Sequence, residues 1–352
     1  MKVLHVISSL AVGGAERLLS DLLPEIKKAG VDVGLLVYKR HHNFIEKKIE
    51  NAGINIISLD FKSIFNPLIV ISLFKIFRGY DIIHAHLFPA LYQVAIARAF
   101  CHGKLVYTEH STNNKRRNRY YLRRIEQYMY RRYSKIVCVS KEAQETLSTW
   151  LDGFENRISV ITNGIDLSGY QYFERDSSHP FTLLMISRFS AAKDHATVIR
   201  AMKDISEAAQ VFFVGDGALR KACKDLAVEL GVDDRIHFEG IQTDVVHYIA
   251  KSDVGILSSH WEGLPLTAIE MMAGGLPVVG SNVAGIRPVL EGAGLLFEEG
   301  DAKHLAEIIN TLIINRDYCR QISFRCKNRA KMYDVRSTAE KYVLLYESLM
   351  KE

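Results

Sequence analysis

The sequence has few cysteines and no long apolar run. Its cysteines are Cys101, Cys138, Cys223, Cys319 and Cys326. They are odd in number and lack C-x-x-C spacing, so we expect neither a disulfide framework nor a zinc site, and a reducing cytoplasm fits. The nearest candidate for a membrane span, Leu68–Phe77, contains Lys75 and is shorter than the roughly 18 apolar residues required. Because Met1-Lys2 leads directly into the apolar Val3–Ile7, we expect no secretory leader.

The net charge of +5 conceals an asymmetry between the two halves of the chain. Residues 1–165 hold 24 Lys and Arg against 14 Asp and Glu, a net charge of +10. The remainder holds 21 against 26, a net charge of −5. A basic first half indicates an anionic partner, and on charge alone nucleic acid and an anionic membrane surface both stay open.

Short apolar runs alternate with amphipathic segments along the first half. The expected strands are Val3–Ile7, Val33–Val37, Ile56–Leu59, Ile82–His84 and Leu105–Tyr107. Helical patterns lie between them, near residues 14–29, 44–51, 67–77 and 92–100. Because buried parallel strands are continuous apolar runs, this alternation predicts βαβ units around a parallel sheet.

The same alternation restarts in the second half. The expected strands there are Thr182–Ile186, Val211–Val214, Ile236–Phe238, Val254–Leu257 and Pro277–Gly280. The intervening Asn163–Pro180 is polar and holds Gly164 and Gly169, which is typical of a linker. The predicted fold class is α/β, with two doubly wound Rossmann-like domains over residues 1–165 and 166–334. In such sheets, ligands bind outside the carboxyl ends of the strands.

The strongest local signal is Glu262–Glu270, which follows the expected strand Val254–Leu257. Pro265 suits a helix start, where the free N–H groups of Leu266 and Thr267 and the helix dipole favour an anion. Two carboxylates beside an anion site fit a ligand that also offers hydroxyls, as a nucleotide sugar does. The alternative is a capped helix with solvated acids.

Cations and glycines follow two other expected strands. Arg188 and Lys193 come after Thr182–Ile186, and both the guanidinium fork and the ammonium point charge suit phosphate. Gly13 and Gly14 follow the first strand, where glycine lets the backbone approach a ligand closely. They do not fit G-x-G-x-x-G, and a tight turn explains them equally well.

Histidine follows a further expected strand, and a basic tract comes after it. His110, beyond Leu105–Tyr107, can hydrogen-bond a sugar or transfer a proton, with His84 and His86 as rivals. Lys115–Lys135 holds nine Lys and Arg, five Tyr and one acid, a composition that suits nucleic acid or a membrane interface. A solvated helix face is the alternative.

In their order along the chain, these motifs resemble glycosyltransferase family 4. The motifs are Gly13-Gly14-Ala15-Glu16, His110, Asn163-Gly164-Ile165-Asp166, Ser187-Arg188-Phe189 with Lys193, Gly215-Asp216-Gly217, Phe238-Glu239-Gly240 and the E-x7-E pair Glu262 and Glu270. The resemblance covers almost the whole chain, and residues 262–279 carry its most specific part. It implies a GT-B fold, in which two Rossmann-like domains face each other across the active-site cleft, and a retaining transfer from a nucleotide diphospho-sugar.

The resemblance also implies roles for individual residues. Arg188 and Lys193 would hold the diphosphate. Glu270 would bind the ribose hydroxyls and Glu262 the donor sugar, while His110 would contact the sugar near the reaction centre. Further donor contacts are implied at Gly13, Gly14, Gly215, Phe238, Gly263, Leu266 and Thr267.

Two further features bear on this resemblance. Family members often have Asp after the motif histidine, whereas this chain has Ser111, which leaves open what orients His110. The family also often ends in a helix that crosses back to the first domain, here at about residues 335–352.

No Asp-x-Asp triplet occurs, so we expect no metal and no other cofactor, and the cations would stabilise the leaving diphosphate. We expect a UDP- or GDP-sugar donor and a glycan or lipid-linked acceptor in surface polysaccharide biosynthesis. Lys115–Lys135 would place the enzyme at the cytoplasmic face of the membrane. One alternative is an epimerase or phosphorylase of the same fold, although no constellation of general bases is visible. The other is a nucleic-acid-binding protein using the basic tract, although we expect no nucleic acid.

Overall fold

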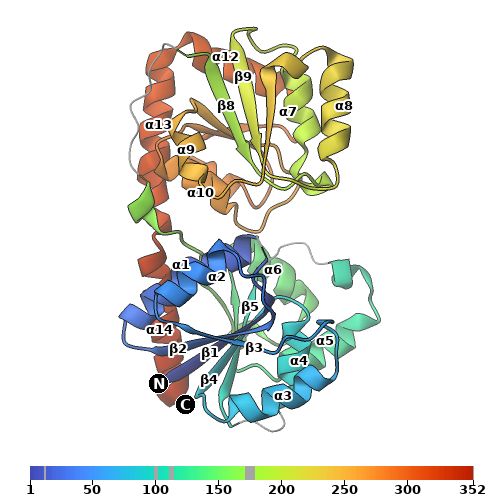
Figure 1. Ribbon diagram of the computed structural model, residues 1–352, viewed down its shortest axis with the longest axis vertical. Helices are drawn as coiled ribbons and strands as arrows, with labels where there is room; N and C mark the ends of the chain where they lie inside the picture. The colour runs from blue at the N-terminus through green and yellow to red at the C-terminus, as the bar shows by residue number, and fades with distance from the viewer. Residues whose placement is uncertain (12, 99–101, 111–114, 171–178, 352) are drawn as a thin grey trace. The chain divides into compact units, whose positions relative to one another are not determined.

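The chain divides into two compact units. The computed structural model describes residues 1–11, 13–98, 102–110, 115–170 and 179–351 (Figure 1). Unit 1 comprises Met1–Asp166 and Asp334–Glu352, and unit 2 comprises Leu167–Tyr333. Cys101, Ser111 and residues 171–178 of the expected linker lie outside the described residues.

Unit 1 is built on a parallel sheet of seven strands within the described residues, in the order β3-β2-β1-β4-β5-β6-β7. Its strands are β1 (Lys2–Ser9), β2 (Asp32–Lys39), β3 (Asn55–Ser58), β4 (Ile82–His86), β5 (Lys104–Glu109), β6 (Lys135–Cys138) and β7 (Ile158–Val160). Its helices are α1 (Gly14–Lys28), α2 (Phe44–Asn51), α3 (Leu68–Phe77), α4 (Ala90–Ala97), α5 (Leu122–Tyr130), α6 (Lys141–Trp150) and α14 (Val335–Lys351).

Helices cover both faces of this sheet. Leu4 and Val6 of β1 belong to the core that includes side chains of α3 and α4. Because side chains alternate along a strand, His5 points to the other face. There α14 packs against α1 (Figure 1). Tyr346 of α14 contacts His5. Both sheet faces are therefore buried.

The chain returns to unit 1 through a close backbone crossing. Ile165 forms a parallel bridge with Asp334, and the N–H of Val335 donates to the carbonyl of Ile165 over 3.0 Å. A β-carbon at Gly164 would lie only 2.6 Å from the backbone nitrogen of Val335. Glycine is therefore required in this motif because two backbones touch.

Unit 2 has a second parallel sheet, with six strands in the described residues and the order β10-β9-β8-β11-β12-β13. Its strands are β8 (Phe181–Ile186), β9 (Ala209–Val214), β10 (Ile236–Gly240), β11 (Val254–Leu257), β12 (Val278–Ser281) and β13 (Leu295–Phe297). Its helices are α7 (His195–Ala201), α8 (Arg220–Leu230), α9 (Val245–Ala250), α10 (Leu266–Ala273), α11 (Arg287–Leu290), α12 (Ala302–Ile314) and α13 (Arg316–Ala330).

The predicted class, two α/β domains with parallel sheets, is confirmed. Every expected strand is present, with ends that differ by a few residues. The strands β6, β7 and β13, each three or four residues long, were not predicted. Within the described residues, no helix has the length and apolar character needed to span a bilayer.

Candidate functional site

Each sheet contains one point where the strand order changes direction. In unit 2 the chain lays β9 and β10 on one side of β8, then places β11, β12 and β13 on the other. In unit 1 the corresponding neighbours are β1 and β4. Ligands of doubly wound sheets bind at the carboxyl ends of such neighbours. Ligand-binding residues are therefore expected in the loops after β8, β11, β1 and β4.

Lys193 and Glu262 meet at this point in unit 2. Lys193 follows β8 and Glu262 follows β11, and the ammonium donates to Oε1 of Glu262. The hydroxyl of Ser259 donates to the same oxygen over 2.8 Å. An ammonium has three N–H donors, and within the described residues the Lys193 ammonium bonds only to Glu262, so two donors remain for a ligand.

The Lys193 loop is fixed by the neighbouring strand connection. The hydroxyl of Ser258 donates to the carbonyls of Lys193 and Asp194, over 3.0 and 2.8 Å. The N–H of His260 donates to the carbonyl of Ala192 over 2.9 Å. These bonds between the β8 and β11 loops pre-position the ammonium opposite the carboxylate.

Arg188 lies two residues after the end of β8, where hydrogen bonds hold the backbone in place. Its side chain is exposed and has no hydrogen bond or ion pair within the described residues. The backbone beside it is pinned by the next loop, since Phe189 N–H donates to the Asp216 carbonyl over 3.1 Å. A β-carbon at Gly215, whose φ is +141°, would lie 2.0 Å from the carbonyl oxygen of Ser187. Gly215 thus serves the packing of the Arg188 segment.

Helix α10 begins at Leu266. Pro265 occupies the N-cap position, where its side chain makes no capping hydrogen bond. Ala268 and Ile269 donate to the Pro265 carbonyl, whereas no hydrogen bond in the described chain engages the N–H of Leu266 or Thr267. These two donors and the helix dipole suit an anion. Gly263 lies in the half-buried loop before the helix.

The two carboxylates of the E-x7-E pattern have different surroundings. Glu262 is partly exposed in the loop, with 11% of its side chain accessible. Glu270 lies within α10 and is buried, with 1% accessible. Because burying a carboxylate costs free energy unless it is hydrogen-bonded, the surroundings of Glu270 constrain it more than those of Glu262 do.

Phe238 lies at the end of β10 and packs within unit 2. Its ring centroid lies 5.9 Å from that of Phe189 and 5.6 Å from that of Phe213. The ammonium of Lys224 lies 5.4 Å from the ring centroid. The structure therefore gives Phe238 a packing role, and its expected contact with the base stays a prediction.

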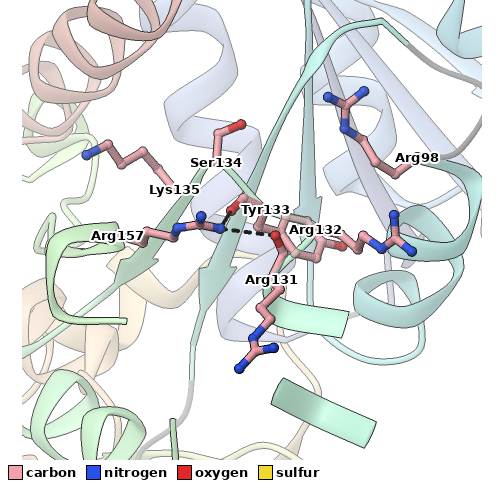
Figure 2. Close-up of a pocket in the computed structure, with 7 residues that line it drawn as sticks. All are labelled: Arg98, Arg131, Arg132, Tyr133, Ser134, Lys135 and Arg157. Carbon is pink, nitrogen blue, oxygen red and sulfur yellow. Dashed lines mark hydrogen bonds between the residues drawn. The ribbon is translucent and has the colours of Figure 1, made fainter. Parts of the chain in front are cut away.

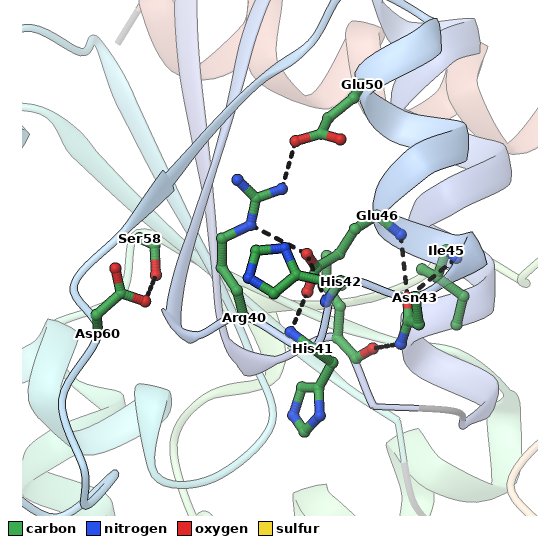
Figure 3. A network of polar contacts seen from close by, with 10 residues as sticks. Arg40, His41, His42, Asn43, Ile45, Glu46, Glu50, Ser58 and Asp60 are labelled. Atoms are coloured by element: carbon green, nitrogen blue, oxygen red, sulfur yellow. Dashed lines mark hydrogen bonds and ion pairs between the residues drawn. The ribbon is translucent and has the colours of Figure 1, made fainter.

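A polar network in unit 1 contacts Leu10, which lies between β1 and the glycine turn in the sequence (Figure 3). Asn43 caps α2 and its amide donates to the Leu10 carbonyl at the end of β1 over 2.6 Å. Burial acts to raise the pKa of Glu46, but hydrogen bonds from the His41 and His42 N–H groups and from Arg40 lower it below its usual value. The network fixes the chain that leads into the turn.

Gly14 itself faces open space. A β-carbon there would meet no atom of the described chain within 4 Å, and one at Gly13 would meet only the flexible carboxylate of Glu16. Neither glycine has a left-handed φ. The fold therefore does not demand glycine at position 14, which favours close approach of a ligand as the reason for it.

His110 is half-buried beyond β5 and is oriented by another histidine. Its Nε2 lies 3.1 Å from Nδ1 of His86. His84 and His86 are fully buried in β4, and His86 is the last residue of that strand. Burial lowers the pKa of His110 to about 4 and that of His5 to about 3, and places those of His84 and His86 well below the usual value. All four rings are neutral at pH 7.

Three of these rings form a group that a metal ion would fit in size. One ring nitrogen from each of His5, His84 and His86 lies within 4.8 Å of the others, and all three are fully buried. Every ring nitrogen of the three already has a hydrogen-bond partner. A metal would have to replace those bonds.

The structure sorts the basic tract into two kinds of arginine. Arg116 pairs with Glu126 over 2.8 Å and Arg117 with Glu109 over 2.8 Å. Arg123 bonds to the Trp150 carbonyl over 3.0 Å. These arginines hold unit 1 together.

Other cations of unit 1 line an open hollow of about 600 Å³, and none of its lining residues in the described part of the chain is an acid (Figure 2). Its lining residues are Arg98, Arg131, Arg132, Tyr133, Ser134, Lys135 and Arg157. Arg157 donates to the carbonyls of Arg131 and Tyr133 over 3.0 and 3.4 Å. A hollow of this composition attracts anions.

The chain matches two family models that together span most of its length. Residues 12–168 match the model described as Glycosyltransferase Family 4, and residues 173–329 match that of Glycosyl transferases group 1. The fold is GT-B, and the chain belongs to glycosyltransferase family 4.

Individual relatives agree with this membership. The N-acetyl-alpha-D-glucosaminyl L-malate synthase of Bacillus anthracis is 31% identical over 54% of this chain, and the match spans about half (53%) of that protein. The UDP-Gal:alpha-D-GlcNAc-diphosphoundecaprenol alpha-1,3-galactosyltransferase of Escherichia coli is 28% identical, covering 74% of this chain and 73% of that protein. HepE of Anabaena, solved in complex with UDP-glucose, is 23% identical with a TM-score of 0.87, covering 99% of this chain and 100% of that one.

Sequence reasoning missed the residues that position the site. Ser258 and Ser259 directly follow β11, and such placement was a detectable signal. Tyr342 and Tyr346 of α14 reach the buried histidines from more than two hundred residues away in sequence, and no local pattern reveals such a contact.

Proposed function

We propose that this chain is a retaining glycosyltransferase that moves a hexose-type sugar from a nucleotide diphospho-sugar to a glycan or lipid-linked acceptor. The observation that carries the proposal is the pairing of Lys193 with Glu262 at the switch point of unit 2, beside the exposed Arg188. The pair offers a cation for phosphate and a carboxylate for sugar hydroxyls in one place. The UDP-glucose complex of HepE and the UDP-galactose named for the Escherichia coli relative support a UDP-sugar, and a GDP-sugar is the other donor.

Charge stabilisation accounts for the proposed chemistry. As the glycosidic bond breaks, negative charge grows on the leaving diphosphate. Arg188, Lys193 and the N–H groups at the start of α10 then stabilise that charge, usually the largest contribution in such catalysis. Glu270 binds the ribose hydroxyls and Glu262 the donor sugar. His110 of unit 1 binds a sugar hydroxyl.

The first prediction tests the phosphate and ribose assignments. Arg188→Ala and Glu270→Gln should each lower kcat/KM for transfer by roughly 100- to 1,000-fold, the loss typical of an electrostatic group in a transition state. Circular dichroism and the unfolding midpoint should stay close to the parent values. Arg200→Ala removes an exposed arginine from α7 of the same unit and is the control. Near-parental kcat/KM in either site variant would contradict the assignment.

The second prediction concerns Gly14. Gly14→Ala should leave the free protein as stable or up to about 1 kcal/mol more stable, because alanine suits the first turn of a helix better. The rise in Tm that saturating UDP-glucose or GDP-mannose gives the parent should be lost, because the new methyl occupies the open space. Gly79→Ala, whose β-carbon would meet only the Ile76 carbonyl at 3.8 Å, should keep it. An undiminished rise in Gly14→Ala would refute ligand contact there.

The third prediction concerns metals. We propose that the two cations and the α10 start replace a bridging metal ion at the diphosphate. The transfer rate should therefore be the same in EDTA as without it. Loss of turnover in EDTA, with recovery on adding Mg²⁺ or Mn²⁺, would show that a metal is needed.

The acceptor side of the proposal places the enzyme at an anionic membrane surface in surface polysaccharide biosynthesis, at the cytoplasmic face. Helices α3, α4 and α5 contact one another in that order and form one helical layer of unit 1 (Figure 1). Exposed apolar and aromatic side chains lie on these helices and in the turns that lead into α3 and α5. They are Phe65, Leu68, Ile71, Ile96, Tyr120, Tyr121, Ile125 and Tyr128. Leu68 is 52% and Tyr120 77% exposed. Aromatic rings suit the headgroup region, and each nearby cation adds about 1 kcal/mol of attraction to an anionic leaflet.

The fourth prediction tests this membrane contact with liposomes. The chain should co-sediment with anionic vesicles, less so at high salt, and little with neutral ones. Arg131→Ser with Arg132→Ser and Lys135→Ser should weaken binding, since these line the basic hollow. Arg116, Arg117 and Arg123 are unsuitable because they form internal ion pairs.

A matched control removes the same charge from exposed positions of unit 2, by Lys203→Ser with Lys251→Ser and Lys303→Ser. This control should bind anionic vesicles nearly as well as the parent. Equal and negligible binding of the parent to both vesicle types would refute the membrane proposal and leave the donor assignments intact.

A further inference from the structure

A chain of seven hydrogen-bonding side chains runs from α14 across the buried face of the unit 1 sheet to His110. In order, its members are Tyr342, Thr108, His84, Tyr346, His5, His86 and His110. Successive polar atoms lie 3.1, 2.7, 2.6, 3.3, 2.9 and 3.1 Å apart. All members except His110 are almost fully buried.

The hydroxyl protons of Tyr342 and Thr108 each have one available acceptor among the described residues. Within the described residues, the hydroxyl of Tyr342 has a single hydrogen-bond partner, Oγ1 of Thr108. Its proton must therefore be donated to that oxygen, because a buried O–H without an acceptor is costly. The Thr108 hydroxyl then has only Nε2 of His84 left as an acceptor.

The direction of donation that begins at Tyr342 fixes the direction at each following histidine, because a neutral imidazole has one N–H donor and one acceptor nitrogen. With Nε2 accepting, His84 carries its proton on Nδ1 and donates to the Tyr346 oxygen. The Tyr346 hydroxyl then donates to Nε2 of His5. His5 donates from Nδ1 to His86, and His86 donates from Nδ1 to Nε2 of His110.

We propose that this series of hydrogen bonds locks His110 in the tautomer with its proton on Nδ1. Tyr342 and Tyr346 of the C-terminal helix are then positioning residues for the site. In that tautomer Nε2 is occupied by His86 and Nδ1 is a hydrogen-bond donor with no partner in the described chain. His110 donates a hydrogen bond to an oxygen of its ligand and does not accept a proton from it. Only the identity of that oxygen, on the donor sugar, rests on the proposed function.

The tautomer can be measured directly in the ligand-free full chain. In protein labelled with ¹⁵N-histidine, long-range ¹H–¹⁵N correlation spectra distinguish a protonated ring nitrogen from a bare one. The signals of His110 are those lost in His110→Gln. At neutral pH we expect a proton on Nδ1 of His110 and none on Nε2. A proton on Nε2, or on both nitrogens, would overturn the proposal.

A hydroxyl deletion tests whether α14 sets this state. Tyr346→Phe removes the O–H that donates to Nε2 of His5, so nothing then holds that nitrogen unprotonated. The Nε2–H tautomer of His110 should rise from an undetected to a measurable share. Tyr133→Phe is the control, because that buried hydroxyl donates to the Leu91 carbonyl over 2.6 Å and contacts no histidine among the residues that the structure describes. An unchanged His110 in Tyr346→Phe would refute the role of the helix.

The same spectra separate this proposal from a metal site and from the proposed function. One equivalent of Zn²⁺ should leave the signals of His5, His84 and His86 unchanged, whereas a joint stoichiometric shift would show a metal site there and overturn the proposal. Since no substrate is present, a chain that transfers no sugar but shows the expected tautomer would refute the proposed function alone.

Discussion

Both sheets are parallel and covered by helices on both faces, and this burial constrains where charged groups can lie. The strand backbones satisfy one another, and the side chains on both faces face an apolar interior. Charged side chains therefore gather where strands end. Lys193 and Glu262 follow neighbouring strands of unit 2 and form an ion pair for that reason. The Gly13-Gly14 turn follows β1 in unit 1 by the same logic.

The buried histidines of unit 1 are the exception, and they follow a stricter rule. His5 and His84 are register partners in adjacent strands and point to the face that α14 covers. Neutral rings inside a core are tolerated only if every N–H finds an acceptor, because a misdirected donor costs about 1–3 kcal/mol. Tyr342 and Tyr346 of α14 supply the remaining hydrogen-bond partners of this buried group. The helix thereby acts on His110, beyond the carboxyl end of β5, with which it shares no hydrogen bond among the described residues.

The net charge of the first half does not show which of its cations are available to an anionic ligand, because some of them are paired within unit 1. Lys115–Lys135 has uniform composition along the sequence, yet Arg117 is 8% exposed and paired inside the unit, while Arg131 is exposed beside the hollow. The first kind contributes to folding, because breaking a buried ion pair strands a charge. The second kind is available to an anion. The two kinds look identical in the sequence.

The sequence by itself determined the two α/β units, the strand ends that carry Arg188 and Lys193, and the start of α10. Each depends on apolar periodicity or on a residue type next to a strand, which are local properties. It did not determine what orients His110, because Ser111 offered no carboxylate and the group that does so, His86, is itself bonded to His5, which Tyr346 of α14 contacts. It also did not separate packing glycines from open ones. Gly215 and Gly14 look alike until the surrounding backbone is known. Only the tertiary structure decided these points, because hydrogen-bond partners and backbone contacts come from segments far apart in the chain.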